Sequence, residues 1–192
     1  VVLPPDVNFS SVGFTIENLA DLPEDELKRQ IGSEDGRWKV SDGNGGEQGI
    51  RFGLSAIKNV GILAIESIIR AREDGIFKSM FDMCSRVETR LVNRKALESL
   101  IKAGAMDGFG SRASQLLAMD QCLENVHKNV KNAISGQASL FGEEELSMQN
   151  SFSLPEVEEM GLDKLLVFER DLLGFYLHEP PYLKHLSQIG GY

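Results

Sequence analysis

The sequence predicts a mainly α-helical protein with a small antiparallel β element, and two patterns of apolar residues carry this prediction. From Ile62 onward, apolar residues recur every three or four positions, the spacing that places them on one face of a helix. Before that point, Gly13 to Glu17 and Ile50 to Leu54 alternate between apolar and polar residues, as half-buried strands do. We expect the second strand to return and pair with the first.

Five helices are expected after the second strand, and local signals mark some of their ends. Asn93 is a good N-cap, and Gly104 suits the position after the C-cap of the same helix. Ser111 can cap a longer helix that ends near His127. The expected buried faces consist of Ile65, Ile68 and Ile69; of Phe77, Phe81, Cys84 and Val87; of Ala96, Leu97, Leu100 and Ile101; of Leu116, Leu117, Leu123 and Val126; and of Leu165, Leu166, Leu172 and Leu173.

Composition shifts divide the chain into four segments. Residues 1–54 hold the β element and a long acidic, glycine-rich loop over residues 18–49, in which residues 23–31 could form a short helix. Residues 55–127 are the main helical region. In residues 128–162 the apolar residues no longer recur at helical spacing, which predicts a linker. Residues 163–192 contain a last helix, which is expected to end at Gly174.

Composition also excludes several classes of protein. No run approaches the roughly 18 apolar residues that a membrane span needs, and no export signal is present. Cys84 and Cys122 lie on apolar helical positions, so we expect free thiols in a reducing cytoplasm. The three histidines, His127, His178 and His185, lie far from any cysteine cluster, and no metal site or cofactor is expected in this segment.

The net charge of −9 hides an uneven distribution. Residues 50–112 carry eleven Lys and Arg against seven Asp and Glu, a local charge of +4, whereas residues 1–49 carry −6 and residues 113–192 carry −7. Phosphate binding depends on the local field, so the middle of the chain is compatible with a nucleic-acid surface. An ordinary solvated helical surface would show the same mild excess.

The stretch from Gly53 to Ala64 resembles a helix-hairpin-helix motif: a short helical turn, a tight turn ending in glycine, and a second helix. Such a hairpin presents backbone N–H groups to a phosphate oxygen, and a glycine lets the phosphate approach. The motif usually has a further glycine where Asn59 stands, and Asn tolerates the left-handed backbone that the turn requires. A plain turn between helices would share this pattern. The expected DNA contacts are Lys58, Asn59, Val60, Gly61 and Ile62.

A second hairpin is expected over Leu100 to Met106. With Arg94, Lys95, Lys102 and Gly104 it would hold the other strand of a duplex across the minor groove. A simple C-cap at Gly104 explains the same residues without DNA.

A short peptide in the polar linker has a different character. Leu140 and Phe141 are adjacent large apolar residues, flanked by glycines and preceded by Gln137. The pentapeptide Gln137, Ala138, Ser139, Leu140 and Phe141 resembles the motif by which bacterial proteins bind the sliding clamp. The alternative is that Leu140 and Phe141 pack against their own domain.

Longer runs resemble one family in order along nearly the whole chain: the alpha subunit of bacterial DNA polymerase III, a replicative C-family polymerase. These runs are Val2 to Asn8, Arg51 to Leu54 with Ala56 to Lys58, Val92 to Ala105, Gln137 to Gly142, and Leu172 to Leu177. The chain departs from the family pattern at Asn59, in the long loop over residues 18–49, and over residues 178–181, where the family usually has glycine-histidine-proline.

The resemblance implies a fragment of a DNA-directed DNA polymerase that covers the late fingers region and leads toward an OB-fold domain. The parent enzyme would use Mg²⁺ and deoxynucleoside triphosphates, with its catalytic carboxylates upstream, so no catalytic residue is expected here. The implied partners are duplex DNA, the beta sliding clamp and other replicase subunits. Two other functions remain open: a stand-alone helix-hairpin-helix adaptor in repair or recombination, and a helical interaction module that does not bind DNA.

Overall fold

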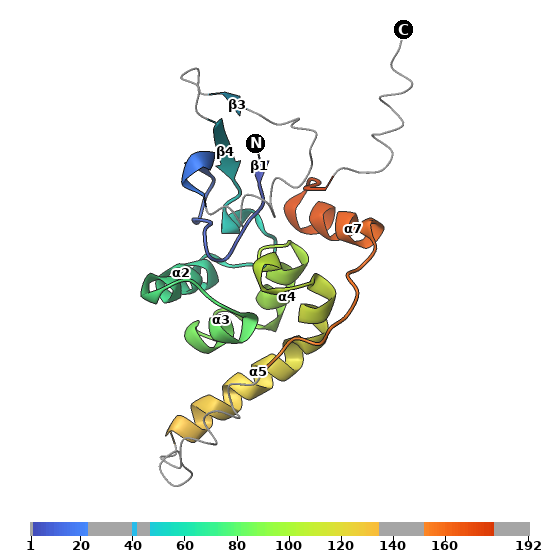
Figure 1. Cartoon of the computed structure of the whole chain (residues 1–192). Coiled ribbons are helices and arrows are strands. Elements are labelled where there is room, and N and C mark those ends of the chain that lie inside the picture. The colour runs from blue at the N-terminus through green and yellow to red at the C-terminus, as the bar shows by residue number, and fades with distance from the viewer. Residues whose placement is uncertain (1, 23–39, 42–46, 135–151, 179–192) are drawn as a thin grey trace.

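The structure is a computed structural model that describes residues 2–22, 40–41, 47–134 and 152–178. A small sheet lies at one end of the molecule, the helices pack below it, and the long helix α5 extends away from the opposite end (Figure 1). The helix expected over residues 23–31 lies outside the described residues. The elements are β1 (Val2–Leu3), β2 (Thr15–Asn18), η1 (Leu19–Asp21), β3 (Val40–Ser41), β4 (Glu47–Arg51), η2 (Leu54–Ala56), α2 (Ile62–Ala71), η3 (Arg72–Asp74), α3 (Met80–Arg86), α4 (Arg94–Lys102), η4 (Asp107–Phe109), α5 (Arg112–Ile134) and α7 (Leu162–Leu173).

The sheet is mixed, with the order β1-β4-β2 and with β3 also paired to β4. The predicted antiparallel pair is confirmed, since β2 and β4 align Ile16 with Ile50. The additional strand β1 runs parallel to β4 and aligns Val2 with Ile50. The sheet is therefore not purely antiparallel, because Val2–Leu3 also joins it.

One face of this sheet is turned toward the protein. Leu3, Gly49 and Arg51 are buried there. The Nε atom of Arg51 lies 2.7 Å from Oε1 of Glu17 on the neighbouring strand, so the buried guanidinium has a charged partner. A buried charge needs such compensation, and this pair links the side chains of β2 and β4.

The helical core forms between α2, α3, α4 and the first half of α5. Most of the expected apolar faces are confirmed, including Ile65, Ile68, Leu97 and Leu100. The prediction for Leu117 is wrong: its side chain is 67% exposed. On α5 the buried apolar positions are Ala118, Met119, Cys122 and Val126, a face to which position 117 does not belong.

Helix ends follow local chemistry. The hydroxyl of Ser79 accepts a hydrogen bond from the amide of Asp82 at 3.0 Å, so α3 begins at Met80 and not at Phe77 as the apolar pattern suggested. The side chain of Asn93 caps α4 as predicted. Helix α5 continues to Ile134, seven residues past its expected end.

The N-terminal segment is fastened to the helices by polar contacts that are distant in sequence. The amide of Val7 donates to the carbonyl of Ala105 at 2.9 Å. The side chain of Asn8 both accepts from the amide of Phe77, at 2.8 Å, and donates to its carbonyl, at 3.0 Å. The sheet and the helical core are thereby held together as one unit.

The cysteines behave as expected, since Cys84 and Cys122 are both free and buried. A hydrogen bond with Cys122, together with burial, raises the pKa of Cys84, so this thiol stays protonated at neutral pH. Among the described helices, none combines the length and the apolar character needed to cross a membrane.

Candidate nucleic-acid interface

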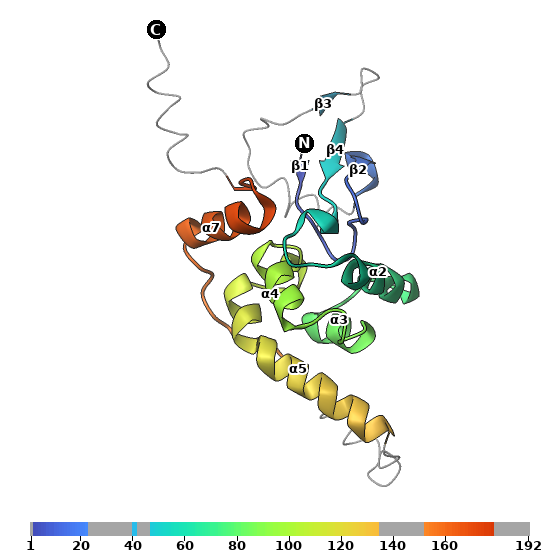
Figure 2. The same cartoon turned by 180° about the vertical axis from the view of Figure 1, so that it is seen from behind.

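The predicted hairpin is present between η2 and α2 (Figure 2). Asn59 has φ of 67°, and it is the single non-glycine residue with positive φ in the described part of the chain. Asn is well suited to this left-handed conformation, which reverses the chain before α2. Gly61 then serves as the N-cap of α2, with φ of −73° and ψ of 155°.

Backbone hydrogen bonds to two neighbouring segments hold the hairpin in place. The amides of Leu54 and Ser55 donate to the carbonyls of Ser11 and Val12, each at 3.0 Å. On another side, the amide of Lys58 donates to the carbonyl of Leu172 at the end of α7, at 3.0 Å. These bonds fix the backbone that leads into the turn.

The side chain of Asn59 adds a bond to α4, where its Nδ2 atom lies 3.4 Å from Oγ of Ser99. Asn59 therefore supplies both the backbone conformation of the turn and a contact that orients it. The turn is a rigid element of the fold, as a preformed binding surface needs to be.

The N-terminus of α2 is open to solvent. Within the described residues, the amides of Gly61, Ile62 and Leu63 donate to no acceptor, and all three residues are exposed. The first turn of α2 contains no acidic side chain that would compete with an anion. The side chain of Lys58 is exposed beside it. Unpaired amides at a helix N-terminus attract a negatively charged oxygen.

Gly61 is unusual because nothing in the fold requires a glycine there. Its φ is allowed for any residue, and a Cβ added at Gly61 would meet no atom within 4 Å. Ser, Asn or Asp would stabilise an N-cap better than glycine does. The empty space in front of the amides is therefore unexplained by folding alone.

Val60 completes the predicted set at this site, but its side chain is buried in the core. It can contribute only its backbone to a ligand. Lys58, Asn59, Gly61 and Ile62 remain at the surface.

Much of the positive charge of residues 50–112 is neutralised within the fold. Arg51 pairs with Glu17, Arg94 with Asp120, and Arg112 with Glu169, three acids that lie outside residues 50–112. Exposed cations without an ion pair to any described residue are Lys58, Lys78, Arg90 and Lys95. The local field available to a ligand is weaker than the sequence count of +4 indicates.

The second predicted hairpin differs from the first. The backbone at Gly104 turns back as predicted, with φ of 83°, the amide of Gly104 bonded to the carbonyl of Ile101, and that of Ala105 bonded to the carbonyl of Leu100. Gly104 itself is buried, and a Cβ there would lie 2.3 Å from Nη2 of Arg112. A phosphate cannot approach Gly104, because the guanidinium of Arg112 occupies that side.

The cations near the second hairpin are also engaged. Arg94 is exposed and makes two hydrogen bonds to Asp120, of 2.7 and 3.1 Å. The ammonium group of Lys102 lies 2.5 Å from Oε1 of Glu98 and 5.0 Å from the centre of the Phe168 ring. The hydrogen bond from Lys102 lowers the pKa of Glu98, so this carboxylate stays ionised and remains paired with Lys102. Of the cations predicted here, Lys95 has no ion pair with a described residue.

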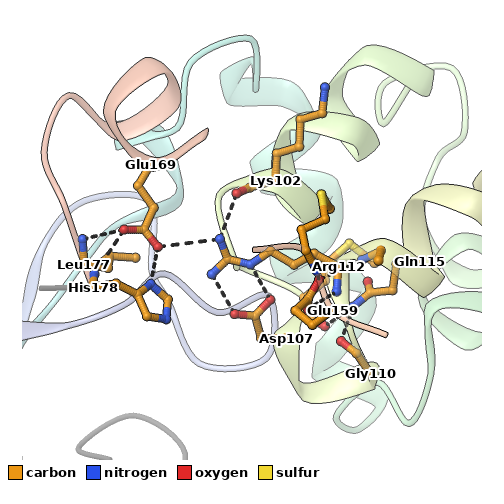
Figure 3. Close-up of polar contacts among 12 residues, drawn as sticks. Lys102, Asp107, Gly110, Arg112, Gln115, Glu159, Glu169, Leu177 and His178 are labelled. Atoms are coloured by element: carbon orange, nitrogen blue, oxygen red, sulfur yellow. Dashed lines mark hydrogen bonds and ion pairs between the residues drawn. The ribbon is translucent and has the colours of Figure 1, made fainter. Parts of the chain in front are cut away.

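Arg112 is the centre of a polar network that the sequence did not reveal (Figure 3). Its guanidinium donates twice to Asp107, at 2.9 and 2.8 Å, and once to the carbonyl of Lys102, at 3.1 Å. The buried carboxylate of Glu169 lies 3.6 Å from the same guanidinium. Arg112 thus ties together the end of α4, η4, the start of α5 and α7.

Two carboxylates complete this network. Glu159 accepts from the amides of Arg112 and Ala113, at 2.7 and 3.0 Å, and so caps α5. Glu169 accepts from the amide of Leu177 at 2.8 Å and lies 2.5 Å from Nδ1 of His178. The hydrogen bond with Glu169 raises the pKa of His178, since it favours the protonated ring.

No local pattern in the sequence marks Arg112 or Glu169, because each looks like an ordinary charged residue on a helix. One available signal was that Ser111 had been assigned as the N-cap of α5, so Arg112 stands at its first position, where a cation is disfavoured. The described residues form no group of three or more His, Cys, Asp or Glu side chains that could hold a metal ion. The pentapeptide Gln137 to Phe141 lies outside the described residues.

Comparison with protein families decides the classification of this fold. The family model described as a helix-hairpin-helix motif matches residues 1–116, which is more than half of the chain. The chain belongs to the helix-hairpin-helix family. The match includes both the hairpin at Gly61 and the second turn at Gly104.

Several curated relatives of this helix-hairpin-helix chain carry one name, DNA polymerase III subunit alpha. The protein from Bacillus subtilis is 38% identical over 189 residues, 98% of this chain, and that from Thermus aquaticus is 36% identical over 187 residues, 96% of this chain. The Campylobacter jejuni protein is 40% identical over 147 residues, 75% of this chain. The chain spans only 12 to 14% of the length of these relatives. The resemblance to this family that the sequence motifs indicated is confirmed.

Proposed function

We propose that this chain is part of a cytoplasmic bacterial replicative DNA polymerase. In that enzyme it binds duplex DNA and attaches the polymerase to a sliding clamp. The relatives named as polymerase subunits support DNA-directed DNA synthesis as the parent activity. We propose that the parent enzyme uses Mg²⁺ for it. We assign binding and not catalysis to this segment, since the resemblance to the polymerase family implies catalytic carboxylates upstream of it.

The observation that carries DNA binding is the open N-terminus of α2. Three exposed amides point from a rigid turn, Lys58 stands beside them, and the glycine at position 61 leaves the space in front of them clear. A phosphate oxygen fits this arrangement through charge-assisted hydrogen bonds. Contacts of this kind hold the backbone without reading sequence.

Binding to fluorescent duplexes over a salt series tests this function. Gly61→Val adds branched carbons in front of the amides at a φ that valine accepts, so it should weaken binding to all sequences alike. Lys58→Ala should reduce the slope of log affinity against log salt by roughly one unit. Lys128→Ala removes the same charge on α5, where Lys128 pairs with Glu124, and should leave DNA affinity unchanged.

Two results would contradict the proposal. One is an affinity that does not depend on salt. The other is a folded Gly61→Val protein that binds as the parent does. In either case the hairpin would be only a structural turn, as in a helical interaction module.

Clamp binding rests on the pentapeptide Gln137 to Phe141. Each of the two large apolar side chains should gain roughly 1.5–3 kcal/mol on entering a pocket of the clamp. Leu140→Ala combined with Phe141→Ala should therefore cost about 3–6 kcal/mol, at least ~100-fold in affinity. Gln137→Ala should cost about 1 kcal/mol, since a single exchanged hydrogen bond has a modest net value.

Titration against purified beta clamp, with melting curves measured alongside, separates the clamp peptide from a segment packed on its own domain. Leu146→Ala is a matched control in the same stretch, outside the pentapeptide. If the double variant binds the clamp normally and melts at a lower temperature, the peptide belongs to the fold and not to a partner. Contacts with other replicase subunits are expected only in the context of the longer chain.

A further inference from the structure

The outer face of the small sheet is apolar and exposed. Val2, Ile50 and Ile16 lie side by side across β1, β4 and β2, because both outer residues align with Ile50. Their side chains are 41%, 42% and 71% exposed. Three large β-branched residues in one row on the open side of a sheet are unusual for a protein surface.

A second row extends this surface. Phe14 directly precedes β2 and Phe52 directly follows β4, so both lie at the edge of the sheet beside the paired residues Thr15 and Arg51. The ring centres of Phe14 and Phe52 are 4.5 Å apart, and Phe175, after α7, stacks on Phe52 at 4.3 Å. We call Val2, Phe14, Ile16, Ile50 and Phe52 the outer sheet face.

The outer sheet face is unsuited to nucleic acid. Residues 1–49 carry a charge of −6, and Arg51, the cation of β4, is buried on the opposite side of the sheet against Glu17. A surface that binds a phosphate backbone needs exposed cations. The β-branched and aromatic side chains instead fit the apolar surface of another protein segment.

We propose that the outer sheet face is a docking surface for the residues that precede this segment in the polymerase chain. This rests on the proposed function in one respect, that the chain is part of a longer subunit. The Bacillus subtilis relative is about seven times as long as the region that it shares with this chain, since the chain covers 14% of it. Residues that precede Val2 in such a chain leave directly from this face, because Val2 is part of it.

Tethering favours this occupant over a free partner. A segment joined covalently to β1 meets the face at a high effective concentration, so modest apolar burial suffices to dock it. A second copy of the chain would have to supply the same area without that advantage.

Cysteine labelling tests the proposal. Ile16→Cys places a thiol at the most exposed position of the face, and Leu117→Cys places one at a similarly exposed apolar position on α5. The native Cys84 and Cys122 are buried, which keeps the background low. Each variant is made in the 192-residue chain and in the full-length subunit, and a maleimide reacts with the folded protein before peptide mapping.

In the 192-residue chain we expect both introduced thiols to react at similar rates. In the full-length subunit, Ile16→Cys should react at least about tenfold more slowly, whereas Leu117→Cys should not change. Equal reactivity of Ile16→Cys in both proteins would overturn the proposal. So would protection that is already present in the 192-residue chain, protection that appears only at high concentration, or protection conferred by added duplex DNA. These three results would assign the face to this chain's own residues, to a second copy and to nucleic acid respectively. Loss of DNA binding would overturn the proposed function while leaving the labelling contrast intact.

Discussion

Replacing Gly61 with serine should make the protein more stable and a weaker DNA binder at the same time. Gly61 is the N-cap of α2, and its backbone already has the extended conformation that serine prefers in this position. A Cβ there meets no atom within 4 Å, so the substitution introduces no strain. The added hydroxyl can accept a hydrogen bond from the amide of Leu63 or Ala64.

The expected magnitudes follow from these bonds. Serine exceeds glycine as an N-cap by a few tenths of a kcal/mol, which sets the gain in the free energy of unfolding. A phosphate that loses one charge-assisted bond to a backbone amide loses roughly 1.5–3 kcal/mol, equivalent to about 10- to 150-fold in affinity. The salt slope should stay near that of the parent, since Lys58 is retained.

Urea unfolding and fluorescence anisotropy on the same preparations measure both quantities. Gly61→Ala is the matched control: it adds a carbon of similar bulk but no acceptor, so it should weaken both α2 and DNA binding. The reasoning would be refuted by a serine variant that gains stability and keeps full DNA affinity. In that case the amides of α2 do not bind phosphate.

Three further predictions concern catalysis, packing and pH. The 192-residue chain should incorporate no nucleotide into a primed template with Mg²⁺, and template-dependent extension by the pure chain would contradict this. Gly104→Ala should cost at least about 2 kcal/mol of unfolding free energy, whereas Gly174→Ala should cost about 1 kcal/mol; both glycines have φ of 83°, but only at Gly104 would a Cβ meet Arg112. Glu169 raises the pKa of His178 in the folded protein above its value in the unfolded chain. Their contact therefore stabilises the fold fully at pH values below the pKa of the unfolded chain. This stabilisation is lost as the pH rises through the pKa of His178 in the folded protein. His178→Gln should therefore cost more stability at pH 6 than at pH 9, by less than about 1 kcal/mol because the ring is partly exposed, and an equal cost at both pH values in urea titrations would refute the coupling.

Local signals in the sequence predicted the helices and the hairpin well. Asn93, Gly104 and Gly174 act at helix ends as their chemistry indicates, and Asn59 adopts the left-handed conformation expected of it. These features depend on a few neighbouring residues, so the sequence contains what is needed to find them.

Features that depend on distant partners were missed or misjudged. The parallel pairing of β1 with β4 joins residues 48 positions apart, and no local pattern encodes it. Gly104 looked available to a phosphate because the sequence does not show that the Arg112 side chain lies over it, held by Asp107, by the carbonyl of Lys102 and by the distant Glu169. Leu117 was assigned to the core because it is apolar, although the buried face of α5 includes the smaller Ala118 instead.

The bonds of Val7 and Asn8 have a consequence for the order of events during synthesis. Their partners, Ala105 and Phe77, are made roughly 70 to 100 residues later, which at bacterial rates of about 5–20 residues per second is a delay of several seconds or more. Throughout that interval Val7 and Asn8 have none of these partners. The earliest synthesised part of the segment must therefore be among the last to reach its final place, and a chaperone or a nascent upstream domain has time to hold it first.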